Sequence, residues 1–305
     1  MAPRTHLAWL LAAGALILVA LGGAGGLRAY HLGTRPPFLD PDFLVQPSRP
    51  PAVDHKTLLV AGTGSCLHVI YPLLESFGKS SAGRGITVKY TTGIGSEGGI
   101  QAAVEGAVSL GMVARPLTGN ERNQLPVVIP FARVAVVVVA SGDVPLRGLT
   151  SAELLDLYRG ARPRWSTGAT VQVLQREPGD PDHLAVGRAL PGFSAINQEA
   201  YRRQRWRVLP RGASTWQQLR WGSGAVGLAD MEGQDGQVKV LPVDGAVPSP
   251  VRLVRGEYPF YKDLALVAPG PLTGPAAGFV RFIFSDAGQS AIRSKGLVPL
   301  PRMKR

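Results

Sequence analysis

The stretch TLLVAGTGSCLHVIYPLLESF, residues 57–77, decides the fold that the sequence predicts. It starts with a run of β-forming residues, turns at two glycines, and continues with apolar residues at helical spacing. The same order repeats downstream, with strands predicted over Ile86–Thr91 and Ser109–Val113 and a short helix over Gly99–Glu105 between them. Because strand–helix–strand units of this length form parallel sheets covered by helices, we expect an α/β fold.

A long apolar run, Phe131–Ala140, has the length needed to cross from one α/β unit to a second. Strand and helix signals continue after it, beginning with a capped helix predicted over Ser151–Tyr158. Two lobes joined by crossing strands hold a ligand cleft between them, at the carboxyl ends of the strands. We expect lobe one to comprise residues 56–135 and 241–305, and lobe two to comprise residues 136–240.

The first 29 residues have the pattern of an export signal or membrane anchor. Arg4 precedes a 15-residue apolar run, Leu7 to Leu21, and a series of small residues follows. Residues 30–55 are rich in proline and predict a semi-rigid linker. We therefore expect a periplasmic or extracytoplasmic protein whose signal is either cleaved or retained as an anchor.

The composition of the chain excludes several kinds of site. The chain has 33 Lys and Arg residues against 21 Asp and Glu, and the first 55 residues contribute little of this excess. Apolar residues make up 45% of the chain, enough for a substantial core. Cys66 is the single cysteine, which excludes an internal disulfide and a cysteine-rich metal site. The histidines have no acidic or thiol companions at metal-binding spacing, so we expect no metal and no cofactor.

The sequence shows no catalytic constellation. It has no Gly-x-Ser-x-Gly elbow. Cys66 lies two residues before His68, where side chains on a helix diverge, which favours a buried structural thiol. We expect a binding protein rather than an enzyme, and keep a hydrolase that uses Ser65 or Cys66 as an alternative.

A cluster of arginines surrounds Trp206. Its members are Arg202, Arg203, Arg205, Arg207 and Arg211. Basic residues around an aromatic ring are compatible with nucleic-acid binding. Export and the absence of a recognition motif instead favour a solvated or partner-facing surface, so we expect no nucleic-acid partner.

Two glycine-rich turns each join a predicted strand to a helix. They are Thr63-Gly64-Ser65 and Gly93–Gly98. Such turns present backbone N–H groups and a helix N-terminus, both of which favour an anion. The second turn matches the dinucleotide fingerprint but lacks the acidic residue about 20 positions later, and a plain tight turn is the other alternative. Two such turns in consecutive units indicate one cleft, where a third turn, at residues 222–227, is also expected.

Five stretches carry a resemblance to a known family. They are Gly62–Ser65, Gly95–Ile100, Leu110–Leu117, Leu149–Gly160 with Trp165, and Ala287–Leu300. Together they resemble the periplasmic phosphate-binding proteins of ABC transporters. The similarity extends over residues 57–301 and implies a two-lobed type II periplasmic binding protein fold, with a cleft between the lobes.

The resemblance implies an extracytoplasmic protein that binds a small oxyanion, most plausibly phosphate, for a membrane ABC transporter permease. It also implies a monomer. Helix N-termini at Ser65 and Ser96 would face the anion, and Arg115 and Arg176 would add a planar fork from each lobe. The ligand-binding residues expected are Thr63, Gly64, Ser65, Gly95, Ser96, Glu97, Arg115, Arg176 and Asp180.

Two departures from the family pattern favour an alternative function. Ala114 stands where the family usually has a polar side chain, and the segment Arg176–Asp182 has acids where hydroxyls are usual. A carboxylate repels a fully ionised anion, although it accepts the proton of a monohydrogen phosphate. The alternative is a membrane-anchored sensory or assembly protein that kept the fold and has no transport role.

Overall fold

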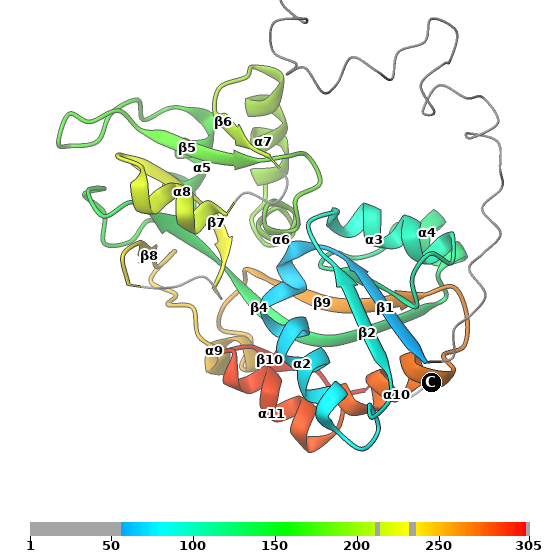
Figure 1. Ribbon diagram of the computed structural model, residues 1–305. Helices are drawn as coiled ribbons and strands as arrows, with labels where there is room; N and C mark the ends of the chain where they lie inside the picture. The colour runs from blue at the N-terminus through cyan, green and yellow to red at the C-terminus, as the bar shows by residue number, and fades with distance from the viewer. Residues whose placement is uncertain (1–55, 211–213, 232–235, 303–305) are drawn as a thin grey trace, which may run out of the picture. The chain divides into compact units, whose positions relative to one another are not determined.

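A computed structural model describes residues 56–210, 214–231 and 236–302 (Figure 1). The predicted signal or anchor, the predicted linker up to residue 55, and Arg211 lie outside these residues. Among the described helices, none combines the length and the apolar character that crossing a membrane requires.

The strands form one hydrogen-bonded series in the order β2-β1-β3-β9-β4-β7-β5-β6, with β8 and β10 also paired to β4. Their bounds are β1 Thr57–Gly62, β2 Thr87–Thr91, β3 Leu110–Val113, β4 Val127–Ala140, β5 Gln172–Arg176, β6 Arg207–Leu209, β7 Ala225–Asp230, β8 Lys239–Leu241, β9 Tyr261–Ala268 and β10 Val298–Pro299. The pairs of β1 with β2 and β3 are parallel, and so are those of β5 with β6 and β7. The expected α/β fold with parallel strand pairs is confirmed.

Strand β4 belongs to two groups of strands. Its first part, from Val127 to Ala135, pairs antiparallel with β9, and its last part, from Val136 to Ala140, pairs antiparallel with β7. Figure 1 shows β4 running from the group that contains β1, β2 and β3 to the group that contains β5, β6 and β7. The apolar run that was expected to cross between two units does so.

Helices cover these strands, and most begin at the residues that the sequence favours. Their bounds are η3 Gly64–Cys66, α2 Leu67–Lys79, α3 Gly95–Val104, α4 Gly119–Gln124, α5 Ser151–Arg159, α6 Pro181–Ala189, α7 Phe193–Arg202, α8 Thr215–Trp221, α9 Pro250–Val254, α10 Gly274–Ile283 and α11 Asp286–Ser294. In helix α5, local sequence signals set both ends: Thr150 and Glu153 form a capping box at its start, and Gly160 ends the helix in the left-handed conformation. Helix α3 begins four positions before its predicted start, because glycines at its N-terminus hide the helical pattern.

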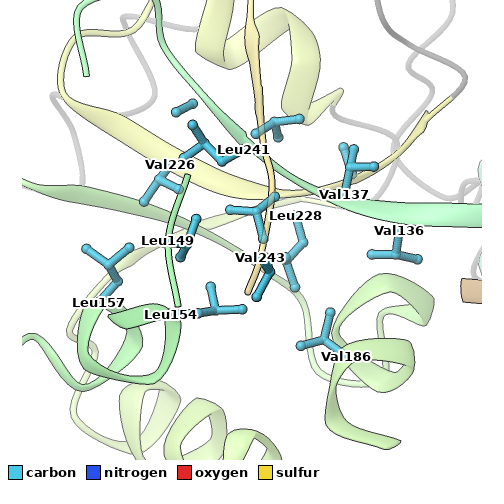
Figure 2. Packing of buried hydrophobic residues seen from close by; sticks show 14 of the residues in the cluster. Val136, Val137, Leu149, Leu154, Leu157, Val186, Val226, Leu228, Leu241 and Val243 are labelled. Carbon is cyan, nitrogen blue, oxygen red and sulfur yellow. The ribbon is translucent and has the colours of Figure 1, made fainter. Parts of the chain in front are cut away.

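The buried apolar residues gather around the two strand groups. Figure 2 shows the cluster around β7 and the last part of β4, in which Val136 and Leu228 lie on the side that faces Val186 of α6. A second cluster packs α2, α10 and α11 against β1, β3 and β9. Val243, Leu253, Tyr258 and Phe260 belong to the first cluster, although they follow residue 240. We therefore propose that lobe two extends to about residue 260, rather than to residue 240.

Close backbone packing fixes helix α3 against β1 and β3. A Cβ atom added to Gly99 would lie 2.8 Å from the Gly62 Cα and 2.8 Å from the Met112 carbonyl oxygen. Real Cβ atoms do not approach backbone so closely, so the helix would have to move. Only glycine at this position lets the N-terminus of α3 lie against the ends of these strands.

We predict that Gly99→Ala destabilises the protein by about 1–3 kcal/mol, because overpacking outweighs the better helix propensity of alanine. Urea unfolding measures the change. Gly119→Ala is the matched control, since its Cβ would meet no atom within 4 Å, and it should be neutral or stabilise by up to about 1 kcal/mol. Equal effects of the two substitutions would contradict the close-packing argument.

Candidate ligand-binding cleft

A cavity of about 560 Å³ lies where the carboxyl ends of β1, β2, β3, β5 and β7 meet. Its volume is typical of pockets for small ligands. All nine residues predicted to bind the ligand line this cavity. The third glycine-rich turn does not, because residues 222–224 precede β7 and so lie at the opposite, amino end of that strand. That part of the sequence prediction is wrong.

The turn after β1 presents two hydroxyls. The Thr63 Oγ1 atom accepts a hydrogen bond from the Ser65 backbone N–H at 3.3 Å and caps η3. The Ser65 Oγ atom accepts a hydrogen bond from the Lys262 Nζ at 2.9 Å. Each oxygen therefore already accepts a hydrogen bond from the protein.

The turn after β2 presents a third hydroxyl. Gly93 and Gly95 have φ angles of +82° and +73°, which the turn into α3 requires and glycine tolerates. Helix α3 has no side-chain cap, and the Ser96 Oγ atom accepts a hydrogen bond from the Ala114 backbone N–H at 3.2 Å. The methyl group of Ala114 contributes no polar atom here, but its backbone orients Ser96.

These three hydroxyls share one property. In the described part of the chain, each oxygen accepts a hydrogen bond and none donates its own proton to another protein group. A hydroxyl whose oxygen accepts such a bond still has its proton to donate. Thr63, Ser65 and Ser96 are therefore suited to donate hydrogen bonds to an acceptor-rich ligand.

Arg115 lines the cavity, but Glu121 holds its guanidinium fork. Two hydrogen bonds of 2.8 and 2.9 Å join the guanidinium to the carboxylate. The bond from Arg115 lowers the pKa of Glu121 to about 2, despite partial burial. Arg115 was expected to offer its planar fork to the ligand, whereas the structure has that fork paired with a carboxylate of the protein.

Asp180 also lines the cavity, and the protein itself satisfies its carboxylate. That carboxylate accepts hydrogen bonds from the backbone N–H groups of Asp182 and His183, from the His183 Nδ1 and from the Arg176 Nε. Three of these donors share Oδ1, and the Arg176 Nε reaches Oδ2 at 3.3 Å, so both oxygens of the carboxylate are bonded to the protein. Asp180 therefore caps helix α6, and its carboxylate takes the place that a bound anion would occupy at that N-terminus.

The carboxylate of Asp180 orders a buried chain of polar side chains. His183 Nδ1 lies 3.0 Å from Asp180, and its Nε2 lies 3.0 Å from the Tyr158 hydroxyl. A neutral imidazole with its proton on Nδ1 satisfies both contacts. Burial alone would raise the pKa of Asp180, but the bond from His183 and nearby positive charges outweigh burial and hold that pKa below its ordinary value. Asp180 is thus an ionised structural group.

Sequence reasoning missed several polar groups of the cavity. The cavity is also lined by His68, Thr92, Glu177, Asp182, Ser214, Gln217, Arg220 and Asp230. Lys262, whose side chain is fully buried, contacts Ser65, Asp182 and Asp230 at its edge. The alternation of side chains along β9 could have indicated that Lys262 is buried, since it lies on the same face of the strand as the buried Leu264 and Leu266. Within the described residues, no group of His, Cys, Asp and Glu side chains is arranged to hold a metal ion.

We predict that Glu121→Gln lowers the free energy of unfolding by about 1.5–3 kcal/mol at pH 7, because it removes a charged hydrogen-bonded pair. The pKa of Glu121 is lower in the folded than in the unfolded chain, so its stabilisation is complete above about pH 4.5 and is lost as the pH falls towards 2. Unfolding of both proteins, measured from pH 7 to pH 3, should show the difference shrinking below pH 4.5.

The control is Glu75→Gln, which breaks an exposed pair with Lys79 on helix α2 and should change stability little. A difference between Glu121→Gln and the unsubstituted protein that stays constant down to pH 3 would contradict the assignment.

Comparison with known proteins places this geometry in a family. The model of the PBP superfamily domain matches residues 46–287. No curated protein sequence matches the chain. Among solved structures, the chain is similar to a protein from Clostridium perfringens that is assigned as a phosphate ABC transporter substrate-binding protein and was solved with bound phosphate. The TM-score is 0.71 at 20% identity, and the match covers 80% of this chain and 99% of that one.

Two further structures share the fold. An ABC-type phosphate transport receptor from Vibrio cholerae matches with a TM-score of 0.62 at 17% identity, covering 80% of this chain and all (100%) of that one. The reduced form of OxyR from N. meningitidis matches with a TM-score of 0.57 at 12% identity, covering 80% of this chain and 99% of that one. At these identities the likeness shows the fold alone, which is the two-lobed type II periplasmic binding protein fold with its cleft. The family model extends over most of the sequence, and the chain belongs to the PBP (periplasmic binding protein) superfamily.

Proposed function

We propose that this protein is an extracytoplasmic solute-binding protein that binds a small oxyanion, with phosphate as the proposed ligand, and delivers it to a membrane ABC transporter permease. The observation that carries this proposal is the set of three hydroxyls, on Thr63, Ser65 and Ser96, that line one cavity with protons left to donate. An oxyanion is a ligand with acceptor atoms on every side, and it gains from the positive end of helix α3.

Proteins of the same fold support the choice of ligand. The similar protein from Clostridium perfringens holds phosphate, and the one from Vibrio cholerae is a phosphate transport receptor. Both are transport proteins, which supports binding without chemistry and a permease as the partner. Cys66 is fully buried and does not line the cavity, which weighs against a thiol hydrolase. We propose that the protein acts as a monomer.

The carboxylates of the cavity favour an oxyanion that still carries a proton. The carboxylates of Glu97, Glu177 and Asp230 line the cavity. A carboxylate accepts a hydrogen bond from monohydrogen phosphate, but it only repels sulfate, which has no proton near neutral pH. The site therefore suits phosphate better than sulfate, molybdate or tungstate.

A second function is favoured by the internal pairing of the cations. Arg115 is paired with Glu121, Arg176 with Asp180, and Lys262 with Asp182 and Asp230. Each of these three positive charges is thus already balanced by a carboxylate of the protein. Such a cleft also suits a membrane-anchored sensory or assembly protein that kept the fold without a transported ligand.

We predict that calorimetry at pH 7 detects phosphate binding, and that sulfate, molybdate and tungstate bind at least about tenfold more weakly, because they offer the carboxylates no proton. Each oxyanion is titrated into the protein at the same salt concentration. If none of the four oxyanions gives heat of binding, the transport function is rejected and the sensory or assembly function is favoured.

We predict that Ser96→Ala weakens phosphate binding by about tenfold to a hundredfold, because a hydrogen bond to a charged group is lost. Arg176→Ala should weaken it at least as much, because it also leaves the buried carboxylate of Asp180 without its arginine. Ser294→Ala, which removes an exposed hydroxyl of helix α11 outside the cavity, is the control and should keep the original affinity. If Ser96→Ala and Arg176→Ala also keep it, the ligand lies elsewhere.

A further inference from the structure

Lys262 is a buried charge at the edge of the candidate cleft. It lies on β9, opposite Val134 of β4, and its side chain has no exposed surface. Its ammonium contacts the Asp182 Oδ1 at 2.5 Å, the Ser65 Oγ at 2.9 Å and the Asp230 Oδ2 at 3.1 Å. These partners come from helix α6, the turn after β1 and the end of β7. One side chain thus joins four elements from both strand groups.

The chemistry of the ammonium fixes the direction of its bond to Ser65. A lysine ammonium has three protons and no lone pair, so it only donates hydrogen bonds. The three neighbouring oxygens match its three protons. The Ser65 oxygen must therefore accept, and the Ser65 proton cannot point at Lys262. Since Ser65 lines the cavity, that proton is available to a ligand there.

The two carboxylates keep Lys262 charged in a buried place. Burial alone would lower the pKa of Lys262, but the charges of Asp182 and Asp230 outweigh it and raise that pKa above its ordinary value. The two carboxylates together carry more charge than the one ammonium, so the cluster as a whole does not attract an anion. Any effect of Lys262 on binding should therefore pass mainly through the hydroxyl that it holds.

We infer that Lys262 is a positioning residue of the cleft, which fixes the Ser65 hydroxyl as a hydrogen-bond donor to a bound oxyanion. This inference rests on the proposed function, because it needs an acceptor ligand in the cavity. It gives Lys262, a buried residue of β9, a part in ligand selection. The sequence does not indicate this part, because Lys262 lies far along the chain from the two glycine-rich turns.

A double-mutant cycle for phosphate affinity tests the inference. Calorimetry compares the unsubstituted protein with Lys262→Met, Ser65→Ala and the combined variant. We expect Lys262→Met to weaken binding about tenfold or more in the original protein, but less than about twofold when Ser65 is already alanine. Lys239→Met is the control, since the Lys239 ammonium donates to the Val144 carbonyl oxygen and lies outside the cavity, and it should keep the original affinity.

The outcomes separate the inference from the proposed function. No phosphate binding by the unsubstituted protein would reject both. Two results would overturn the inference alone. In the first, Lys262→Met leaves phosphate affinity unchanged. In the second, it weakens affinity by the same factor with and without the Ser65 hydroxyl, as a purely structural role predicts.

Lys262→Met leaves two carboxylates without their cation and can prevent folding. In that case the combined variant Lys262→Met with Asp182→Asn, which removes one charge of each sign, is compared with Asp182→Asn alone. Weaker binding by the combined variant, by about tenfold, is expected. Equal binding would overturn the inference.

Discussion

The pairing of the buried Lys262 ammonium with Asp182, Asp230 and Ser65 is the interaction on which the arrangement of the cleft depends. An ammonium without exposed surface is tolerated only when charged and polar partners surround it. Those partners come from both strand groups that β4 joins, so satisfying one charge brings the turn after β1 against helix α6 and the end of β7. Strand β4 connects the two strand groups, and the contacts of the Lys262 ammonium hold their ends together at the cleft.

The cleft combines donors and acceptors in a way that limits its ligands. Thr63, Ser65 and Ser96 face it with hydroxyls whose oxygens already accept bonds from the protein. Three of its cations, Arg115, Arg176 and Lys262, are paired with carboxylates of the protein, and the Asp180 carboxylate caps the N-terminus of α6. Attraction for a ligand must then come from directed hydrogen bonds and the end of α3, rather than from net positive charge. A small ligand with acceptors and one proton fits this balance.

Local signals in the sequence predicted much of the fold and part of the cleft. The two glycine turns were placed correctly because a strand, a turn residue and a helix start lie within a few positions of one another. Lys262 was not predicted, because its bond to Ser65 joins residues 197 positions apart. Asp180, which was predicted as a ligand contact, lines the cavity and also caps helix α6, a role that the following Pro181 indicates. The end of lobe two at residue 240 stays a prediction; we propose the later end because Val243, Leu253, Tyr258 and Phe260 share a buried cluster that only tertiary packing reveals.

The most direct test of the account is a crystal structure of the protein with phosphate. The account predicts phosphate in the cavity, with the Ser65 and Ser96 Oγ atoms within hydrogen-bond distance of its oxygens, Lys262 still bonded to Ser65, and the Asp180 carboxylate still bonded to His183 rather than to the ligand. Phosphate bound at another place, or bound in the cavity with Ser65 turned away from it and towards other protein groups, would contradict the account.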